Sequence, residues 1–329
     1  MTKHVAVIMG GWSAERDVSL VTGQAVADAL KQRGYQVTEV DAGRNLAAQL
    51  QDLGPDIVFN ALHGRWGEDG CVQGILEVLN TPYTHSGVMA SAVAMDKPMA
   101  KKLFERVGIP CAAHKIVTYG ELAAEDPMAR PYVVKPINEG SSVGVEIVRD
   151  GDNQPSLPAE PGIEQRDVMV EQDVPGRELA CAVMGGRALG VVELRPIRGF
   201  YDFEAKYSDG ITEHFLPAPV PDGIYEKVRD WSALAHTELQ CRGVTRVDFR
   251  YDDTAADPGD LYILEINTQP GMTPLSLVPE MAAHEGIDFA DLVHWMVEDA
   301  SCPRWPPTTI PVRIVLSRVV TTKAIKKCY

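Results

Sequence analysis

Hydrophobic and polar positions follow two alternating periods over the first ninety-odd residues. Short apolar runs that are typical of buried strands occur at 4–11, 35–41 and 56–64. Apolar positions at helical spacing occur at 18–34, 70–80 and 86–95. Strands that alternate with helices favour a parallel sheet with helices on both of its faces.

A new unit begins at Asp96, which has the character of a helix N-cap. Pro98 follows in the predicted first turn, Gly108 closes the helix, and Pro110 prevents its continuation. We therefore expect a helix shortly after residue 96, at the start of a second structural unit.

From about residue 111 the pattern becomes rich in strands. Two hairpins are predicted, one from 131–136 with 143–148 and one within 178–194 around Gly185-Gly186. A Pro-rich surface loop is expected at 151–162, and a helix at 225–243. Further strands are expected at 167–172, 244–251 and 261–267. The second half of the chain is thus of the α+β class.

The last two predicted strands carry polar side chains at alternate positions. Asp248 lies between Arg246 and Arg250 on one face, and Glu265 shares a face with Asn267. If the strands pair antiparallel, the two carboxylates and the amide converge, and three oxygen donors favour Mg²⁺ or Mn²⁺ over zinc. A solvated strand face with alternating charges explains the pattern equally well.

Three other stretches contain candidate chemistry, and each also has a plain structural interpretation. Lys135 precedes a Gly/Ser loop that suits an anion, although an ordinary hairpin is the better reading of that stretch alone. Glu15 and His63 follow strands at the carboxyl edge of the parallel sheet, where ligands bind, but the spacing of a dinucleotide fingerprint is absent. His63 alone suits a structural histidine. Residues 201–210 suit a closing loop or a plain surface loop.

Length, charge and cysteines restrict the class of protein. A chain of 329 residues suits two or three domains. Its net charge of −15 argues against nucleic acid as a partner. The six cysteines are scattered without a C-x-x-C pair, which suits a reducing cytoplasm. No run approaches the ~18 apolar residues of a membrane span, so we expect a cytoplasmic protein without a membrane partner.

Seven motifs occur together in one order along the chain. They are "GGWSAERDVSL", "LHGRWGEDG", "PYTHSGVMASAVAMDK", "VKPINEGSSVGV", "YDFEAKY", "RVDFR" and "LEINTQPGMTPLSLVP". In these motifs and their spacing the sequence resembles the D-alanine–D-alanine ligases over residues 4 to about 302. The resemblance implies an ATP-grasp fold preceded by an N-terminal parallel-sheet α/β domain. The implied N-terminal domain, with the first D-alanine site, covers residues 1–96. A central ATP-grasp domain covers 97–172, and a C-terminal ATP-grasp domain with the magnesium site covers 173–302. A basic tail follows at 303–329.

The resemblance also implies a reaction and roles for single residues. ATP would phosphorylate one D-alanine, and a second D-alanine would attack the acyl phosphate, yielding D-alanyl-D-alanine for peptidoglycan precursor synthesis. Two Mg²⁺ or Mn²⁺ ions would bind to Asp248, Glu265 and Asn267. The ATP-binding residues would be Lys97, Lys135, Glu171, Gln172, Val174, Glu178 and Lys206. The remaining site residues would be Glu15, His63, Ser141, Tyr207, Arg246, Gly271 and Ser276.

Within that last group the resemblance assigns distinct tasks. Glu15 would bind the ammonium of the first D-alanine, supported by His63 and Ser141. Arg246 and the N–H of Gly271 would stabilise the tetrahedral oxyanion. Ser276 would hold the carboxylate of the second D-alanine, and Tyr207 would belong to the closing loop.

The chain also departs from the family pattern. Gln269 stands where a serine is frequent, and residues 303–329 fit no part of the pattern. That tail carries six Lys or Arg and no acid, so we expect a disordered or non-native extension and not a basic segment for an acidic partner or membrane surface. Dimerisation with a second copy is expected from the resemblance. The alternatives are another carboxylate–amine ligase of the same fold and a non-catalytic nucleotide-binding regulator.

Overall fold

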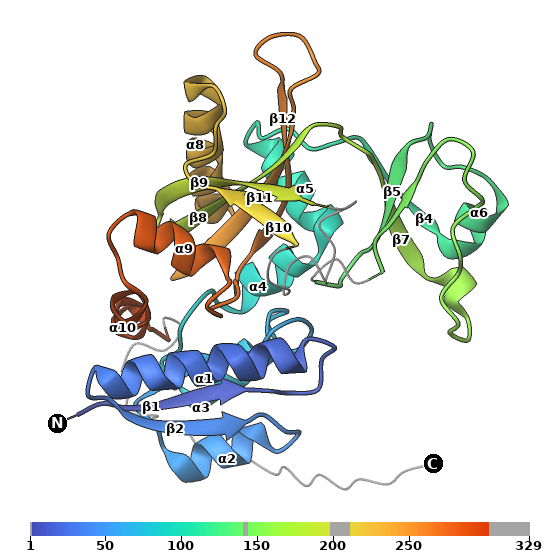
Figure 1. Ribbon diagram of the computed structural model, residues 1–329. Coiled ribbons are helices and arrows are strands. Elements are labelled where there is room, and N and C mark those ends of the chain that lie inside the picture. The colour runs from blue at the N-terminus through green and yellow to red at the C-terminus, as the bar shows by residue number, and fades with distance from the viewer. Residues whose placement is uncertain (1, 141–143, 198–210, 303–329) are drawn as a thin grey trace, which may run out of the picture.

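The structure is a computed structural model and describes residues 2–140, 144–197 and 211–302. Within these residues the strands form three sheets (Figure 1). One is parallel and belongs to the first hundred residues, and the other two are antiparallel. The predicted change from alternating α/β to a strand-rich second half is confirmed.

The N-terminal sheet has the strand order β2-β1-β3. Its strands are β1 (His4–Met9), β2 (Gln36–Asp41) and β3 (Ile57–Asn60). Both neighbours of β1 run parallel to it. Tyr83 extends the sheet by a parallel bridge to Val58, in the stretch that follows the third helix.

Helices cover both faces of this sheet, as the alternation of apolar residues predicts. Val5 and Val7 of β1 pack towards α1 (Arg16–Gln32), whereas Ala6 and Ile8 pack towards α2 (Leu46–Leu53) and α3 (Cys71–Leu79). The short helix α2 is not evident in the sequence pattern, because only Leu46 and Leu50 of its eight residues are buried.

The second unit begins with α4 (Val88–Met95) and α5 (Lys97–Arg106). The predicted N-cap is confirmed, since the Asp96 carboxylate accepts a hydrogen bond from the backbone N–H of Met99 at 3.0 Å. Phe104 of α5 is fully buried against the five-stranded sheet described below.

A four-stranded antiparallel sheet follows, in the order β4-β7-β5-β6. Its strands are β4 (His114–Thr118), β5 (Tyr132–Pro136), β6 (Glu146–Val148) and β7 (Asp167–Gln172). The predicted β5–β6 hairpin is confirmed, and β4 was missed by the sequence pattern. The helix α6 (Tyr119–Ala124), also missed, packs on one face together with a 3-10 turn at Ile163–Gln165. No helix among the described residues covers the opposite face (Figure 1).

A five-stranded antiparallel sheet has the order β10-β9-β8-β11-β12. Its strands are β8 (Arg177–Met184), β9 (Arg187–Pro196), β10 (Thr212–Phe215), β11 (Val244–Asp252) and β12 (Asp260–Asn267). The β8–β9 hairpin and the antiparallel pairing of β11 with β12 were both expected. A bulge after Asp248 interrupts the register of the latter pair.

Helices also cover both faces of this larger sheet. The helix α8 (Asp222–Glu238) packs on the face that carries Leu179 and Cys181. It begins before the predicted range 225–243 and ends earlier, where Gln240 adopts a positive φ of 55°. The opposite face packs against α9 (Leu277–His284), a helix that the sequence pattern did not reveal.

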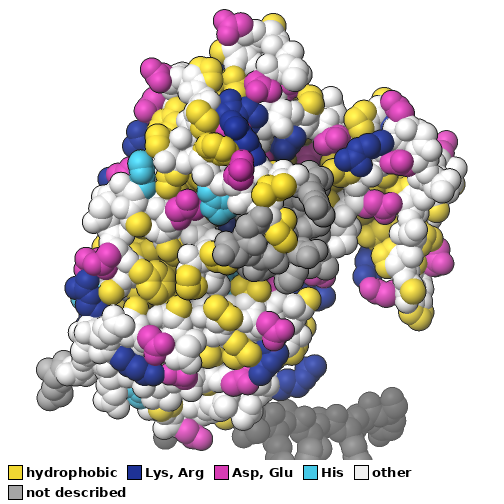
Figure 2. Space-filling model, in the orientation of Figure 1, with side chains coloured by type: hydrophobic (Ala, Val, Ile, Leu, Met, Phe, Trp, Pro, Cys, Tyr) yellow, Lys and Arg dark blue, Asp and Glu magenta, His cyan; other side chains and the backbone are white. Residues whose placement is uncertain are grey.

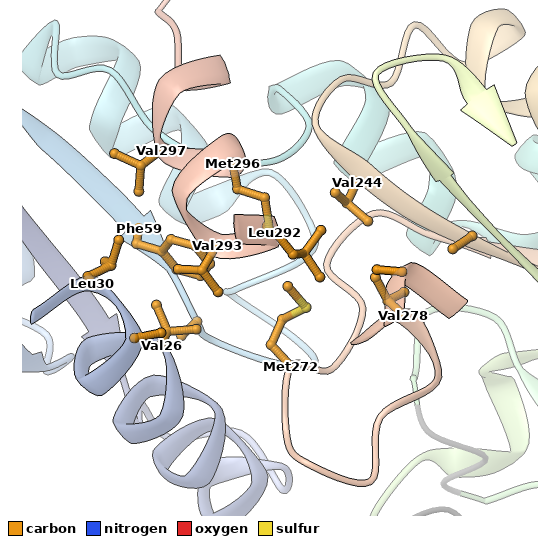
Figure 3. Close-up of a cluster of buried hydrophobic side chains, with 14 of the residues drawn as sticks. Val26, Leu30, Phe59, Val244, Met272, Val278, Leu292, Val293, Met296 and Val297 are labelled. Carbon is orange, nitrogen blue, oxygen red and sulfur yellow. The ribbon is translucent and has the colours of Figure 1, made fainter. Parts of the chain in front are cut away.

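The last helix, α10 (Phe289–Asp299), joins the N-terminal sheet to the five-stranded sheet. Its buried side chains Leu292, Val293 and Met296 share one apolar cluster with Val26 of α1 and Phe59 of β3 (Figure 3). The same cluster contains Val278 of α9 and Met272 of the turn after β12. We will call this group of residues the interdomain cluster.

Candidate active site

A pocket of about 490 Å³ lies between the two antiparallel sheets. Its walls come from the helix-free face of the four-stranded sheet and from β8, β9, β11 and β12. Lys and Arg side chains gather near this hollow on the face seen in Figure 2. Of the residues predicted from the sequence, the pocket brings together Lys97, Lys135, Glu171, Gln172, Val174, Glu178, Asp248 and Glu265.

Lys97 lies at the junction of the two sheets. Its ammonium donates to the backbone carbonyl of Glu139 at 2.5 Å, in the loop after β5. It also lies 3.8 Å from the carboxylate of Glu265 on β12. The first residue of α5 therefore connects the Gly/Ser loop with the candidate metal site.

A group of three charged side chains lies at the wall of the pocket that the four-stranded sheet forms. Glu171 on β7 forms ion pairs with both Lys135 on β5 and Lys101 on α5. Lys101 and Glu171 are each only 1% exposed. Burial alone would raise the pKa of Glu171, but the two ammonium charges and their hydrogen bonds lower it to about 2. Burial likewise acts to lower the pKa of Lys101, and the charge of Glu171 outweighs it, so that this pKa is raised.

The sequence pattern did not reveal Lys101. Its spacing of four residues from Lys97 puts both side chains on one face of α5, and that spacing was the available signal. The side chain of Glu171 faces lysines in this structure, and the group as a whole carries one excess positive charge. A polyanion such as a phosphate chain suits such a site.

A second group of ion pairs on β8 and β9 also lines the pocket and was not predicted. Arg177 and Arg195 both bind the buried carboxylate of Glu193, with Nε–Oε1 distances of 2.9 Å and 2.6 Å. Burial acts to raise the pKa of Glu193, but the hydrogen bonds from both arginines lower it. This group of two arginines and one glutamate therefore also carries one excess positive charge.

The candidate metal ligands converge as expected. Asp248 pairs directly with Glu265 across the two strands, and Arg246 pairs with Asn267. Arg246 binds both oxygens of Asp248 at 2.7 Å, and the Asn267 amide nitrogen lies 3.1 Å from one of them. The Asp248 side chain thus holds the Arg246 guanidinium beside the other two residues.

The donor chemistry of this cluster fits a hard divalent cation. Two carboxylates and one carboxamide offer oxygen atoms from neighbouring strands, the donor type that Mg²⁺ and Mn²⁺ prefer. Across the described ranges, no three His, Cys, Asp or Glu side chains gather in metal-binding geometry. A third protein ligand beside Asp248 and Glu265 would therefore come from Asn267.

Glu15 lies in a second, larger pocket of about 1520 Å³. It directly precedes α1 and is only 5% exposed. Its carboxylate lies close to two glycines, since a Cβ on Gly64 would lie 2.6 Å from Glu15 Oε1 and one on Gly140 3.1 Å from it. Gly64 also has a positive φ of 68°, so a side chain there would both strain the backbone and displace the carboxylate.

His63 is buried behind Glu15 and does not line either pocket. Its Nε2 lies 2.9 Å from the Thr22 hydroxyl, and its Nδ1 lies 3.5 Å from Glu68. The Ser13 hydroxyl donates to its backbone carbonyl at 2.7 Å. These contacts fix the imidazole between α1 and the loop that carries it.

Gly271 and Ser276 lie together in the turn after β12. A Cβ on Gly271 would lie 2.7 Å from the Ser276 hydroxyl, which accepts a hydrogen bond from the N–H of Thr273 at 2.9 Å. The resemblance assigns Gly271 to the oxyanion and Ser276 to the carboxylate of the second D-alanine, and the structure places the two residues next to each other. Three other predicted site residues, Ser141, Lys206 and Tyr207, lie outside the described residues.

Two antiparallel sheets with a pocket between them that is lined by lysines, arginines and carboxylates are typical of the ATP-grasp class of enzymes, and comparison with solved structures agrees. A D-alanine–D-alanine ligase from Bacillus anthracis complexed with ATP superposes with a TM-score of 0.74 at 32% identity, over 91% of this chain and 97% of that one. A second structure of the D-alanine–D-alanine ligase from Bacillus anthracis gives a TM-score of 0.74 at 31% identity, over 91% of this chain and 97% of that one.

Sequence comparison identifies the family. The models for the D-ala D-ala ligase N-terminus and C-terminus match residues 41–86 and 103–298. The D-alanine–D-alanine ligase of Parvibaculum lavamentivorans is 55% identical over 306 residues, which are 92% of this chain and 99% of that protein. That of Paramagnetospirillum magneticum is 56% identical over 307 residues, 92% of this chain and 100% of that protein.

The chain belongs to the D-alanine–D-alanine ligase family. The function of this family is the ATP-dependent joining of two D-alanines for the peptidoglycan precursor. The ATP-grasp fold inferred from the motifs is thereby confirmed. Among the helices that the structure describes, none has both the length and the apolar character needed to cross a membrane.

The buried lysine–glutamate group gives a pH-dependent prediction. Replacement of Glu171 by Gln should lower the free energy of unfolding at neutral pH by about 3–5 kcal/mol, because it leaves buried lysine charge uncompensated. The matched change Glu160→Gln, at the exposed ion pair with Arg166, should cost less than about 1 kcal/mol. Denaturant titrations of the three proteins measure both differences.

The sign of the pH effect follows from the lowered pKa of Glu171. The folded-state pKa of about 2 lies below the ordinary value of 4.5, so the stabilisation is complete above pH 4.5 and is lost as the pH falls towards 2. The gap between the unmutated protein and Glu171→Gln should therefore narrow only below pH 4.5. A gap that stays constant down to pH 3 would contradict the charged state of Glu171.

Proposed function

We propose that this chain joins two D-alanine molecules at the expense of ATP and forms D-alanyl-D-alanine, ADP and phosphate. A carboxylate oxygen of the first D-alanine attacks the γ-phosphorus of ATP, and ADP leaves. The amine of the second D-alanine attacks the acyl carbon of the resulting acyl phosphate. The C–O bond to phosphate then breaks, phosphate leaves, and the amine loses a proton.

One observation supports this proposal most directly: the two pockets adjoin. Pro136, Glu139 and Val145 line both the pocket between the sheets and the pocket that contains Glu15. Phosphoryl transfer from a nucleotide to an amino acid requires that the two substrates meet end to end. A shared wall between a pocket that offers lysine and arginine side chains and a pocket with a buried carboxylate suits that arrangement.

We assign the pocket between the sheets to ATP. Lys97 and Lys135 would bind its phosphates, and the cationic surplus around Glu171 supports this role. Gln172, Val174 and Glu178 would bind the adenine and ribose, the first two largely through their backbone. All of these residues line the pocket.

Asp248, Glu265 and Asn267 would hold two Mg²⁺ or Mn²⁺ ions between the protein and the phosphates. When bound, such ions neutralise the charge of the phosphate oxygens and favour displacement at phosphorus. The cations that now neighbour these ligands, Arg246 and Lys97, would keep the two facing carboxylates compatible with folding before the ions bind.

The two D-alanines would be recognised through different groups, the first by its ammonium and the second by its carboxylate. The buried carboxylate of Glu15, backed by His63, would bind the ammonium of the first. Ser276 would hold the carboxylate of the second, and Arg246 with the N–H of Gly271 would stabilise the oxyanion of the tetrahedral intermediate. The proximity of Gly271 and Ser276 supports the placement of the oxyanion beside the second D-alanine.

We further propose three functional domains with the boundaries 1–96, 97–172 and 173–302. Each contains one of the three sheets, which supports this division. The helix α5 connects the last two, because it belongs to the central domain by sequence while Phe104 packs on the C-terminal sheet.

We also propose that the protein acts in the cytoplasm. The described cysteines are all unpaired, as in a reducing compartment, which supports this location.

The proposed reaction predicts strict dependence on D-alanine. Purified protein with ATP and Mg²⁺ should release ADP rapidly with D-alanine and scarcely with L-alanine or other amino acids. A coupled ADP assay with mass spectrometry of the product measures this. Preference for another acid would favour a different carboxylate–amine ligase of the same fold, and no turnover with any acid would favour a nucleotide-binding regulator.

The proposed metal site predicts that Glu265→Ala abolishes ligation without unfolding the protein. The mutation removes an oxygen ligand at a strand end and little core volume. Glu39→Ala is a matched control, because Glu39 is also a strand glutamate that pairs with a lysine, Lys31. It should retain normal turnover. A folded Glu265→Ala protein with near-normal activity would contradict the metal site and favour a solvent-exposed strand face without a ligand.

We also propose a homodimer, as the family resemblance implies. Val78 on α3 is 85% exposed and Met89 on α4 is 45% exposed, and a second copy would cover these apolar side chains. Sedimentation should give about twice the chain mass of 35.9 kDa, and Val78→Glu should shift the mass towards one chain. A single-chain mass for the unmutated protein at micromolar concentration would contradict the dimer.

A further inference from the structure

The turn after β12 is tied to the N-terminal sheet by a buried pair of amides. Gln269 is 2% exposed and Asn60, at the end of β3, is fully buried. The Asn60 side-chain nitrogen donates to Gln269 Oε1 at 3.2 Å, and the Gln269 side-chain nitrogen donates to the Asn60 backbone carbonyl. Two hydrogen bonds of opposite direction therefore join residues that lie 209 positions apart in the sequence.

Asn60 is itself fixed from the N-terminal side. Its side-chain nitrogen also donates to the carbonyl of Gly67 at 3.0 Å, and its Oδ1 accepts from the N–H of Leu62 at 3.2 Å. The backbone N–H of Asn60 donates to the Thr84 hydroxyl at 3.1 Å. The residues between Leu62 and Gly67 include His63 and Gly64, which contact the Glu15 region.

A second anchor holds the turn on the other side of Gly271. Met272 is 1% exposed and belongs to the interdomain cluster, where it lies between the N-terminal residues and Val278 (Figure 3). Gln269 and Met272 thus flank Pro270 and Gly271, one by hydrogen bonds and the other by apolar packing. Between these anchors the backbone has little freedom to shift relative to β3.

We propose that Gln269 is a positioning residue that couples the two substrate sites. Through Asn60 it fixes the N–H of Gly271 relative to the loop that contains His63 and lies beside Glu15. This inference rests on the proposed function, in which Gly271 stabilises the oxyanion and Glu15 binds the first D-alanine. Gln269 itself touches no substrate, and its effect would pass entirely through the position of the turn.

This arrangement has a chemical consequence that simple loss of stability does not share. If the turn shifts, the acyl phosphate still forms, but its carbonyl no longer meets the N–H of Gly271 and the second amine together. Water can then attack the acyl carbon, phosphate leaves, and the first D-alanine is regenerated. ATP is consumed without formation of dipeptide.

The test compares Gln269→Met with the unmutated protein. Methionine has a similar length but neither donates to the Asn60 carbonyl nor accepts from its amide as glutamine does. Phosphate released and dipeptide formed are measured in the same reaction. We expect kcat/KM for the second D-alanine to fall by about 10- to 100-fold, the range for a displacement near 1 Å, and phosphate to exceed dipeptide.

Gln73→Met is the matched control. Gln73 is also a buried amide, 1% exposed, and it donates to the same Gly67 carbonyl at 2.7 Å without touching the turn. It should lose comparable stability and keep phosphate and dipeptide equal. If Gln269→Met does not fold, Gln269→Ser, which avoids inserting an apolar chain, is measured in its place.

The outcomes separate this inference from the proposed function. A folded Gln269 variant with equal phosphate and dipeptide and unchanged kcat/KM would overturn the positioning role. An equal rise of the phosphate-to-dipeptide ratio in Gln73→Met would also overturn the positioning role, because it would show that any loss of a buried amide in this region has the same effect. Absence of dipeptide from the unmutated protein would instead refute the proposed function.

Discussion

The antiparallel pairing of β11 with β12 is the constraint on which the candidate active site depends. It sets Asp248 directly opposite Glu265, an arrangement of like charges that destabilises a sheet unless cations compensate it. Arg246 and Lys97 provide that compensation in the described structure. A strand pair that needs positive charge for its stability also suits the binding of divalent cations. For the same reason Arg246, assigned to the oxyanion, lies in one hydrogen-bonded group with the proposed metal ligands Asp248 and Asn267.

Charge is balanced differently on the other wall of the pocket. There the carboxylate of Glu171 is fully buried, and two lysines keep it ionised. The lysine that the sequence pattern identified, Lys135, is therefore held in place by Glu171, which also pairs with Lys101, a lysine that the pattern did not identify. The chain as a whole is acidic, with a net charge of −15, so under the proposed function this local excess of positive charge would attract an anionic nucleotide against the long-range field of the protein.

The N-terminal sheet and the five-stranded sheet are held together at a few contacts between distant residues. The interdomain cluster buries Phe59, Met272 and Leu292 from three different parts of the chain. Close to it, Asn60 and Gln269 form the polar counterpart. Apolar packing supplies most of the adhesion, whereas the directional amide pair restricts how the turn after β12 can sit on β3. In the proposed reaction, the apolar packing and the amide pair would together keep the two substrate sites at a fixed distance.

The sequence by itself determined the parallel sheet, the hairpins, the β11–β12 pair and the shared face of Glu265 and Asn267, because these depend on local periodicity of two or 3.6 residues. Motif order was enough to identify the family. Only the tertiary structure decided the partners of Glu171 and the link from Gln269 to Asn60. These contacts join segments far apart in the chain, and each residue taken alone has the pattern of an ordinary helix, strand or turn position.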